Sequence, residues 1–326
     1  MPQICLARHI YAELWLKKEM VIAMEKNDLG GVLCFNKPAG CTSHDIINRV
    51  RKLYGTKQVG HTGTLDPLAT GVLVVMVGRA VKASEFLTAD EKEYVATLKL
   101  GITTDTEDIT GAVISRHDGE MPDFETVKNA VLSFVGEIEQ IPPMYSALKK
   151  DGKKLLDLAR QGVTVEREAR KVRVDAIEIF ETDKNDEFLL NVRVSKGTYI
   201  RTLCADIGKK LGVGGVMATL MRTSSGNFGI EESFDEAQLR EMTEEERYSA
   251  LRPTEELFPD CPEVHLSDFF AKLGACGCDL YQKKIKTDHA FGQLVRLYDK
   301  DGFFALGRVI DASEGSAIKP VKQFRI

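Results

Sequence analysis

The sequence of 326 residues lacks the features that mark several large classes of protein. It has no apolar run near the ~18 residues that a membrane-spanning helix needs, so no membrane association is expected. Neither G-x-x-x-x-G-K-[ST] nor G-x-G-x-x-G occurs, so no nucleotide cofactor is expected. Hydrophobic residues make up 43% and charged residues 29%, which is typical of a globular protein with an apolar core.

Paired cysteines are also lacking. The seven cysteines are odd in number and scattered, which suits a reducing cytoplasm better than a disulfide framework. We therefore expect a cytoplasmic protein. Cys261, His265, Cys276 and Cys278 could be arranged as four zinc ligands, but no C-x-x-C spacing is present, so ordinary thiols are favoured. The sequence predicts no metal site.

The first residues lack the organisation of a signal peptide. Charged residues interrupt and follow the apolar stretch from His9 to Leu16, whereas a signal peptide carries its charges before the apolar stretch. Met20 and Met24 come after this stretch. We expect residues 1–28 to be a poorly ordered N-terminal extension with no function of its own.

Positive charge is scarce overall but locally concentrated. The net charge is −5, which by itself argues against a nucleic-acid partner. Residues 231–263 hold twelve acidic and three basic residues, whereas residues 148–173 hold nine basic and four acidic residues. A basic segment of this kind can follow a phosphate backbone. On composition alone, a solvated helical face is the favoured alternative.

Apolar periodicity predicts an α+β protein. Strands are expected at residues 30–35, 72–77, 92–100, 172–180, 187–194 and 216–222, and helices at 42–54, 124–134, 153–160 and 199–211. Because strands and helices do not strictly alternate, residues 29–260 are predicted to form an α+β catalytic domain with a mixed or antiparallel sheet. Three short strands after the acidic connector predict a small β domain at residues 261–326.

The chemically informative segment is Gly60–Leu73, which places Asp66 on a glycine-rich loop directly before a buried strand. An alternative is that Asp66 and Pro67 form an ordinary turn, and this segment alone does not decide between the two. Aspartyl-phosphate enzymes also use a loop aspartate, but they generally need a second carboxylate two residues on for magnesium. That position is Leu68, so phosphoryl transfer is excluded.

Five motifs, in the same order as in one known family, resolve this ambiguity. Gly60–Leu73 resembles the signature G-H-x-G-x-L-D-P-x-A-x-G-x-L of TruB-type pseudouridine synthases at every fixed position. The other four resemblances are Asn36–Ser43 to K-P-x-G-x-[ST]-S, Lys92–Tyr94 to K-x-Y, Gln140–Lys149 to Q-x-P-P-x-[YF]-S-A-x-K, and Ser195–Arg201 to S-x-G-T-Y-I-R. The resemblance covers roughly residues 30–228.

The resemblance implies roles for five residues. Asp66 would be the nucleophile that attacks either uracil C6 or ribose C1′, and the sequence does not choose between these atoms. Arg201 would be its guanidinium partner, which favours the carboxylate anion. Tyr94 would stack on the target base, Leu220 would pack on its other side, and Lys37 would support the site near the tyrosine. The alternatives are a surface salt bridge for Arg201 and a plain core residue for Tyr94.

The resemblance also implies RNA contacts. A uridine inside the folded T-loop of tRNA must be flipped out before it can react. His61 matches the residue that takes up the vacated space. Residues 142–172 match a thumb-like insertion that closes over the T-arm, and Lys149, Lys150, Lys153 and Lys154 are its expected RNA-binding residues. The C-terminal residues 261–326 resemble a PUA-like RNA-binding domain.

The expected function is the isomerisation of uridine 55 of tRNA to pseudouridine by a cytoplasmic monomer, with no cofactor and no guide RNA. Two alternatives remain. A dyskerin-like synthase directed by box H/ACA guide RNA shares the aspartate loop, but characteristically lacks the thumb insertion. A tRNA-folding chaperone could retain the fold without the chemistry, although the intact set of Asp66, Tyr94 and Arg201 argues against this alternative.

Overall fold

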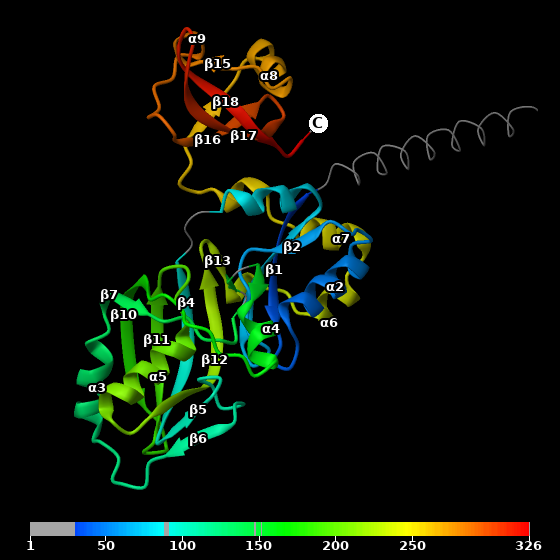
Figure 1. Cartoon of the computed structure of the whole chain (residues 1–326). Coiled ribbons are helices and arrows are strands. Elements are labelled where there is room, and N and C mark those ends of the chain that lie inside the picture. Colours follow the sequence, from blue (N-terminus) through cyan, green and yellow to red (C-terminus); the bar gives the residue numbers. More distant parts are fainter. Residues whose placement is uncertain (1–29, 88–90, 147, 151, 326) are drawn as a thin grey trace, which may run out of the picture.

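The computed structural model describes residues 30–87, 91–146, 148–150 and 152–325. Residues 1–28, for which we expect an extension, lie outside these ranges. The described chain forms a large unit built on a nine-stranded sheet and a small unit built on a five-stranded sheet, joined by short helices (Figure 1). The α+β prediction is confirmed. None of the helices in the described ranges is long and apolar enough to cross a membrane.

The large sheet carries most of the predicted strands. In order across the sheet they are β1 (Gly31–Lys37), β3 (Thr70–Val77), β12 (Gly215–Ser225), β4 (Lys92–Leu100), β11 (Glu187–Val194), β10 (Arg170–Glu181) and β7 (Gly136–Gln140). Two short strands, β2 (Val59–His61) and β13 (Phe228–Gly229), pair with β3 and β12. Only β3 and β12 run parallel along this path, and the other neighbours are antiparallel.

Helices and hairpins surround this sheet. The helices are α2 (Ser43–Leu53), α3 (Phe124–Leu132), α4 (Leu155–Arg160) and α5 (Ile200–Leu211), and the two hairpins pair β5 (Ile102–Thr104) with β6 (Val113–Arg116) and β8 (Lys149–Lys150) with β9 (Lys153–Lys154). Helices α3 and α5 contact each other and the sheet (Figure 1). The helix expected from Lys153 begins at Leu155, because Lys153 and Lys154 pair with the preceding strand instead.

The sequence predicts a helix start at Thr42–Asp45, and in the structure these residues cap the N-terminus of α2. The Thr42 side chain accepts a hydrogen bond from the Asp45 backbone, and the Asp45 carboxylate accepts one from the Thr42 backbone at 2.8 Å. This reciprocal capping satisfies two backbone donors that the first turn of a helix would otherwise leave free. The start of α2 is therefore well defined, and it lies beside the functional loop described below.

The small unit follows a connector that contains α6 (Glu236–Glu241) and α7 (Glu244–Ser249). Its strands, in order across the sheet, are β14 (Glu263–His265), β16 (Leu294–Asp299), β17 (Gly302–Ala312), β18 (Gly315–Gln323) and β15 (Leu280–Tyr281), with helices α8 (Asp268–Ala275) and α9 (Gln282–Ile285) beside them. The connector thus consists of short helices, as its sequence predicted.

Side chains that alternate along β1 enter two different cores. Leu33 and Phe35 belong to the core of the large unit, whereas Val32 and Cys34 belong to a second apolar cluster on the other face of the sheet. This second cluster also contains Leu306 and Phe324 of the small unit, together with Leu257 and Phe258 of the connector. Burial of these side chains packs the small unit against that face of the nine-stranded sheet.

Candidate active site

Residues 60–73, which we call the Asp66 loop, run from the end of β2 into the first residues of β3, and they are held on both sides of Asp66. Ser43 at the start of α2 accepts a hydrogen bond from the Leu65 backbone at 2.8 Å and donates one to the Leu65 carbonyl at 3.1 Å. The Gly40 backbone donates to the Pro67 carbonyl at 2.9 Å. The residues that flank Asp66 are therefore anchored to the segment that precedes and starts α2.

Lys37 holds the Asp66 loop by hydrogen bonds to its main-chain carbonyls. Its side chain is 0% exposed, and its ammonium group donates to the carbonyls of Ala69 at 2.6 Å, Pro38 at 3.0 Å and Pro67 at 3.4 Å. Burial lowers the pKa of Lys37, although Asp66 partly opposes this shift. The sequence predicted a supporting residue near Tyr94, and the structure shows that Lys37 bonds to the Asp66 loop.

Arg201 reaches Asp66 from the first turn of α5. Its Nε lies 2.9 Å from Asp66 Oδ2, and its Nη2 lies 3.4 Å from Oδ1. The same guanidinium donates to the carbonyls of Thr106 at 3.1 Å and Tyr145 at 2.9 Å. The Arg201 side chain is 5% exposed and that of Asp66 is 35% exposed, so the carboxylate remains accessible to a substrate. A guanidinium in this fork geometry fixes the orientation of the carboxylate.

A second carboxylate shares this arginine. Asp108 Oδ2 lies 3.8 Å from Arg201 Nη1, and the Asp108 side chain is 9% exposed. Its other oxygen accepts hydrogen bonds from the Thr106 hydroxyl at 2.9 Å and from the Thr110 backbone and hydroxyl at 2.9 and 2.6 Å. Arg201 is therefore a buried cation between two carboxylates, of which only Asp66 is open to solvent.

The electrostatic balance at Asp66 favours its neutral form more than an ordinary aspartate does. Burial raises the pKa of Asp66, Arg201 opposes that rise, and the negative charge of Asp108 adds to it. The net shift is upward, because loss of hydration outweighs the attraction of the guanidinium. On acidification, Asp66 should accordingly become neutral at a pH above the usual range of an aspartate.

Tyr94 and Leu220 lie on the same face of two neighbouring strands. In the register of β4 and β12, Tyr94 faces Arg222 and Leu220 faces Ala96, so all four side chains project from one side of the sheet. Tyr94 and Leu220 are each 8% exposed and belong to the main apolar core. The hydroxyl of Thr70 donates to the Leu220 carbonyl at 3.3 Å, which links this strand to the Asp66 loop.

His61 lies on β2 at the beginning of the Asp66 loop, where it is half-buried. Burial lowers its pKa, and the nearby Arg222 and His44 lower it further. His61 therefore favours the neutral form at neutral pH, in which a flat, weakly polar ring can lie against other rings. Among the described residues, no partner is found for its buried Nδ1 atom.

The basic segment at residues 148–173 contains the β8–β9 hairpin, helix α4, a loop and the first residues of β10. Lys149 faces Lys154 and Lys150 faces Lys153 across the β8–β9 hairpin. Lys153 is exposed, whereas the side chains of the other three lysines lie outside what the structure describes. Further along this segment, the Arg167 guanidinium donates to the Pro142 carbonyl at 2.9 Å, so one predicted patch residue has a structural partner.

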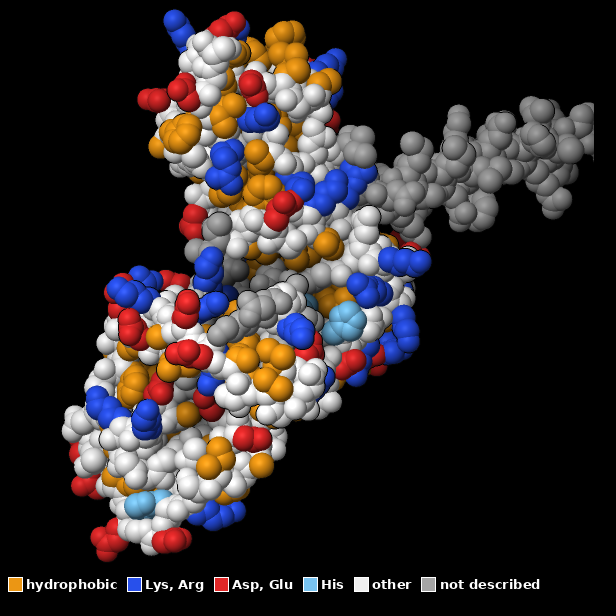
Figure 2. All heavy atoms as spheres, in the orientation of Figure 1, with side chains coloured by type: hydrophobic (Ala, Val, Ile, Leu, Met, Phe, Trp, Pro, Cys, Tyr) orange, Lys and Arg blue, Asp and Glu red, His pale blue; other side chains and the backbone are white. Residues whose placement is uncertain are grey.

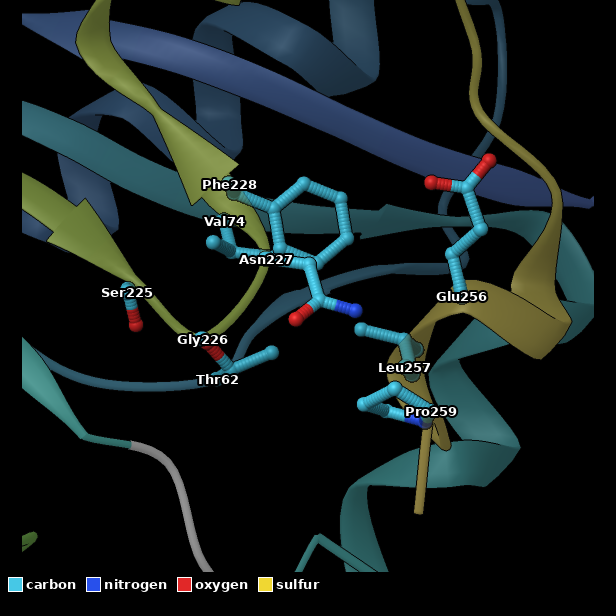
Figure 3. A pocket seen from close by; sticks show the side chains of 9 residues that line it. All are labelled: Thr62, Val74, Ser225, Gly226, Asn227, Phe228, Glu256, Leu257 and Pro259. Carbon is cyan, nitrogen blue, oxygen red and sulfur yellow. The ribbon is translucent and has the colours of Figure 1, made fainter. Parts of the chain in front are cut away.

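A pocket beside Thr62, near the start of the Asp66 loop, is too small to hold the substrate. It lies where the end of β12 meets the connector, as Figure 3 shows, and is lined by Thr62, Val74, Ser225, Gly226, Asn227, Phe228, Glu256, Leu257 and Pro259. Its volume of about 10 Å³ is room for no more than one water molecule. A nucleotide does not fit there.

Two family models match consecutive parts of the chain, together residues 51–258. A model described as TruB family pseudouridylate synthase (N terminal domain) matches residues 51–200, and one described as tRNA pseudouridylate synthase B C-terminal domain matches residues 201–258. The chain belongs to the TruB family of pseudouridylate synthases. The resemblance that the motifs indicated is thereby confirmed.

Curated relatives of this TruB-family chain carry one name. A protein of Clostridium tetani named tRNA pseudouridine synthase B is 41% identical over 281 residues, which is 86% of this chain and 96% of the relative. The protein of the same name in Alkaliphilus oremlandii is 44% identical over 284 residues, covering 86% of this chain and 93% of the relative.

Solved structures of similar fold come from assemblies with other proteins. A chain in the crystal structure of a Cbf5-Nop10-Gar1 complex matches with a TM-score of 0.69 and 30% identity, covering 92% of this chain and 86% of the other. A chain of an archaeal box H/ACA sRNP Nop10-Cbf5 complex matches with a TM-score of 0.66 and 27% identity, covering 92% of this chain and 88% of the other. These likenesses agree with a pseudouridine synthase fold.

Sequence reasoning missed two residues that shape the TruB-family site. Asp108 lies in a run rich in threonine and aspartate at residues 103–110, and that polar run beside a strand was a usable signal. Gln140 lies inside a quoted motif, but received no role. Its buried amide accepts a hydrogen bond from the Tyr199 backbone at 3.0 Å and donates to the Tyr199 carbonyl at 3.2 Å. Gln140 thus fixes Tyr199, the N-cap residue of α5, which lies two residues before Arg201.

Proposed function

We propose that this TruB-family chain isomerises uridine 55 in the T-loop of tRNA to pseudouridine, with Asp66 as the nucleophile. The observation that carries the proposal is the ion pair of 2.9 Å between the buried Arg201 and Asp66, whose side chain is 35% exposed. The curated relatives named tRNA pseudouridine synthase B support tRNA as the substrate.

The chemistry requires no external oxidant or reductant. The bond between ribose C1′ and uracil N1 breaks, the base rotates, and a bond forms between C1′ and C5. The C5 proton leaves and N1 gains a proton, so atoms and electrons balance within the nucleotide. We assign Asp66 to the covalent step at C6 or C1′. Arg201 holds the carboxylate as an anion in one orientation, and no cofactor is expected.

Tyr94 and Leu220 are proposed to hold the detached base. Tyr94 would stack on the base and Leu220 would pack on its other side, and both side chains project from the same face of neighbouring strands. A tyrosine there offers both a stacking surface and a hydroxyl, and the hydroxyl is suited to take up the C5 proton. Lys37 contributes indirectly, since it fixes the carbonyls that follow Asp66.

RNA binding is proposed to involve the side of the molecule that carries the Asp66 loop. His61 would replace the flipped base in the T-loop, and the lysines of the β8–β9 hairpin would contact phosphates. On the face shown in Figure 2, Lys and Arg side chains gather along the junction of the two units and the adjoining edge of the large unit. A band of positive charge there suits an RNA that spans both units.

The domain division follows from the same proposal. Residues 29–260 would form the catalytic domain with a thumb-like insertion at 142–172, and residues 261–326 would form a PUA-like RNA-binding domain. The separate five-stranded sheet and its own apolar core support a distinct C-terminal unit. We further propose that the enzyme is a cytoplasmic monomer that acts on the T-arm without a guide RNA.

The solved complexes suggest an alternative, in which the enzyme needs a guide RNA to find its substrate. Identity to the Cbf5 chains is 30% and 27%, whereas identity to the curated tRNA enzymes is 41% and 44%. The β8–β9 hairpin lies within the insertion that guide-directed synthases characteristically lack. Both observations favour the guide-free enzyme.

The test is an assay with purified protein, an unmodified tRNA transcript labelled at uridine, and no guide RNA. Pseudouridine should form at position 55 with the wild-type protein and with Asp183→Asn, which alters an exposed turn. It should not form with Asp66→Asn. Absence of product from a folded wild-type protein that binds tRNA would refute the guide-free function, and recovery on adding guide RNA would identify the guide-directed one.

A further inference from the structure

Arg222 is a buried cation that the sequence motifs give no role. It lies on β12 next to the parallel pairing with β3 and is 1% exposed, the largest of the fully buried side chains among the described residues. Burying a guanidinium is unfavourable unless its donors are satisfied. Such a residue requires a structural or functional reason for its position.

The donors of Arg222 are directed at the two ends of the Asp66 loop. Its Nε donates to the Val72 carbonyl at 2.6 Å, and its Nη2 donates to the Gly63 carbonyl at 3.1 Å. Gly63 precedes Asp66 and Val72 follows it, so a single rigid group spans the loop that carries the carboxylate. The planar guanidinium has donors at fixed angles, which sets the separation of the two carbonyls.

The backbone of Arg222 is as close to the loop as its side chain. Gly71 has a φ of +93°, and a Cβ atom at Gly71 would lie 2.2 Å from the Arg222 carbonyl oxygen. Only glycine fits this approach, which allows β3 to leave the loop directly against Arg222. The arginine therefore contacts the loop from both its main chain and its guanidinium.

Lys37 and Arg222 hold different parts of the same loop. Lys37 bonds to the carbonyls of Pro67 and Ala69, just after Asp66, whereas Arg222 bonds to carbonyls farther out on either side. Arg201 in turn holds the Asp66 carboxylate itself. The three cations thus act on the centre, the ends and the functional group of the loop.

We propose that Arg222 is a positioning residue for pseudouridine formation: its buried guanidinium ties Gly63 to Val72 and so sets where the loop presents Asp66. It does not touch the substrate, and its effect passes through the main chain of the loop. This inference rests on the proposed role of Asp66, and it adds a requirement that Asp66 and Arg201 alone do not supply.

The link that the Arg222 guanidinium makes between Gly63 and Val72, which we call the clamp, should affect the chemical step more than RNA binding. A displacement of a reacting group by about 1 Å can lower a rate by ~10²-fold. The phosphate-binding residues proposed above lie on other elements and would be unaffected. Loss of the clamp is therefore expected to lower the single-turnover rate while the dissociation constant for tRNA stays close to that of the wild type.

The test compares Arg222→Met, Arg222→Lys and the control Arg240→Met in single-turnover assays with saturating enzyme, beside tRNA binding and thermal unfolding. Methionine has similar length but no donors, and we expect its rate to fall by about 100-fold. Lysine keeps the charge but cannot span both carbonyls, so an intermediate rate is expected. Arg240 is an exposed arginine on α6, and its variant should react like the wild type.

A folded Arg222→Met variant that binds tRNA and reacts at the wild-type rate would overturn the clamp. If this variant does not fold, Arg222→Lys decides: a wild-type rate would overturn the proposal, and a reduced rate with unchanged binding would support it. Inactivity of the wild type in the same assay would instead refute the proposed function, so the two failures are distinguishable.

A second measurement is the pKa of His61, which lies at the start of the Asp66 loop. The charged and titratable groups that bear on His61 are Arg222 and His44, and both lower its pKa. In Arg222→Met the His61 pKa, measured by NMR titration, should rise because one positive neighbour is gone, whereas Arg222→Lys should keep it low. This titration reports the Arg222 charge near His61, whereas the single-turnover rates decide whether Arg222 positions Asp66.

Discussion

The Asp66 loop and the basic segment at residues 148–173 both depend on positive charge, but they use it in opposite ways. At the loop, Lys37, Arg201 and Arg222 are 0%, 4% and 1% exposed, and each donates to fixed oxygens. In the basic segment, Lys153, Arg160, Arg170 and Lys171 are exposed. Burial converts a cation into part of the framework, whereas exposure leaves it available to a partner.

The difference has a measurable consequence. Charges in water are screened by salt over about 10 Å at 0.1 M ionic strength, and buried pairs are screened much less. The geometry around Asp66 should therefore be insensitive to salt, while contacts from the basic segment should weaken as salt is added. Changes in the two regions should separate catalysis from binding.

The largest effect is expected from Asp66→Asn. The amide is close in shape to the carboxylate, but it cannot act as the nucleophile, so product should fall below detection in a single-turnover assay. Affinity for tRNA should remain within about an order of magnitude, since binding comes mainly from phosphate contacts. Measurable turnover by this variant, with Asp183→Asn as its control, would remove Asp66 from the nucleophile role.

A smaller but still large effect is expected from Arg201→Met. Loss of the guanidinium frees the carboxylate from its orientation, and we expect a fall in rate of about 100-fold. It also removes the positive neighbour, so the already raised pKa of Asp66 should rise further. Because the anion is the active form, the acid limb of the pH–rate profile should move to higher pH.

The pH–rate profile of Arg201→Met would be compared with those of the wild type and Arg240→Met. A shift of the acid limb to lower pH, or none at all, would show that Arg201 does not stabilise the Asp66 anion.

Neutralising the hairpin lysines should change binding rather than catalysis. Replacing Lys149, Lys150, Lys153 and Lys154 with alanine should weaken tRNA binding. It should reduce the slope of log K against log salt by up to ~0.9 per lost phosphate contact. The single-turnover rate at saturating enzyme should stay near the wild-type value. The matched control removes four exposed lysines of the large unit, Lys52, Lys184, Lys209 and Lys210.

If both quadruple variants lose the same slope of log K against log salt, the hairpin lysines contribute no more to RNA binding than other surface lysines. An unchanged slope would show that the basic segment is a solvated face without phosphate contacts, which is the alternative that composition alone favoured.

The smallest effect is expected from removing residues 1–28. These residues match none of the motifs, and the deletion should leave the single-turnover rate and the tRNA affinity unchanged. A collapse of turnover in the shortened protein, with its unfolding temperature preserved, would show that the extension belongs to the functional enzyme.

Most of the fold could be predicted from local patterns. The alternation of Tyr94, Ala96, Leu98 and Leu100 predicted β4, and all four side chains are buried. The Thr42–Asp45 capping signal predicted the start of α2. Short elements were harder: β2 was assigned to a loop and Lys153 to a helix. Elements of two or three residues are determined by their pairing partners, and local propensity carries little information about them.

The candidate site was predicted unevenly. Asp66 and Arg201 came from motifs 135 positions apart, and the structure brings them into contact. Asp108, Gln140 and Arg222 were given no role. Gln140 and Arg222 act through the main chain of distant segments, whereas Asp108 contacts the Arg201 side chain. A hydrogen bond to a carbonyl oxygen leaves no trace in the identity of the residue that owns the carbonyl, so such partners are invisible to motif reading.

The sequence by itself determined the family, the α+β class, the loop that carries Asp66 and the location of excess positive charge. These properties follow from the order and identity of the residues, so local propensities and motifs are enough to predict them. Only the tertiary structure decided which cations are buried and what they hold. Burial is set by the packing of β1, β3, β12 and α5 around the loop, and it makes Lys37, Arg201 and Arg222 into parts of one framework.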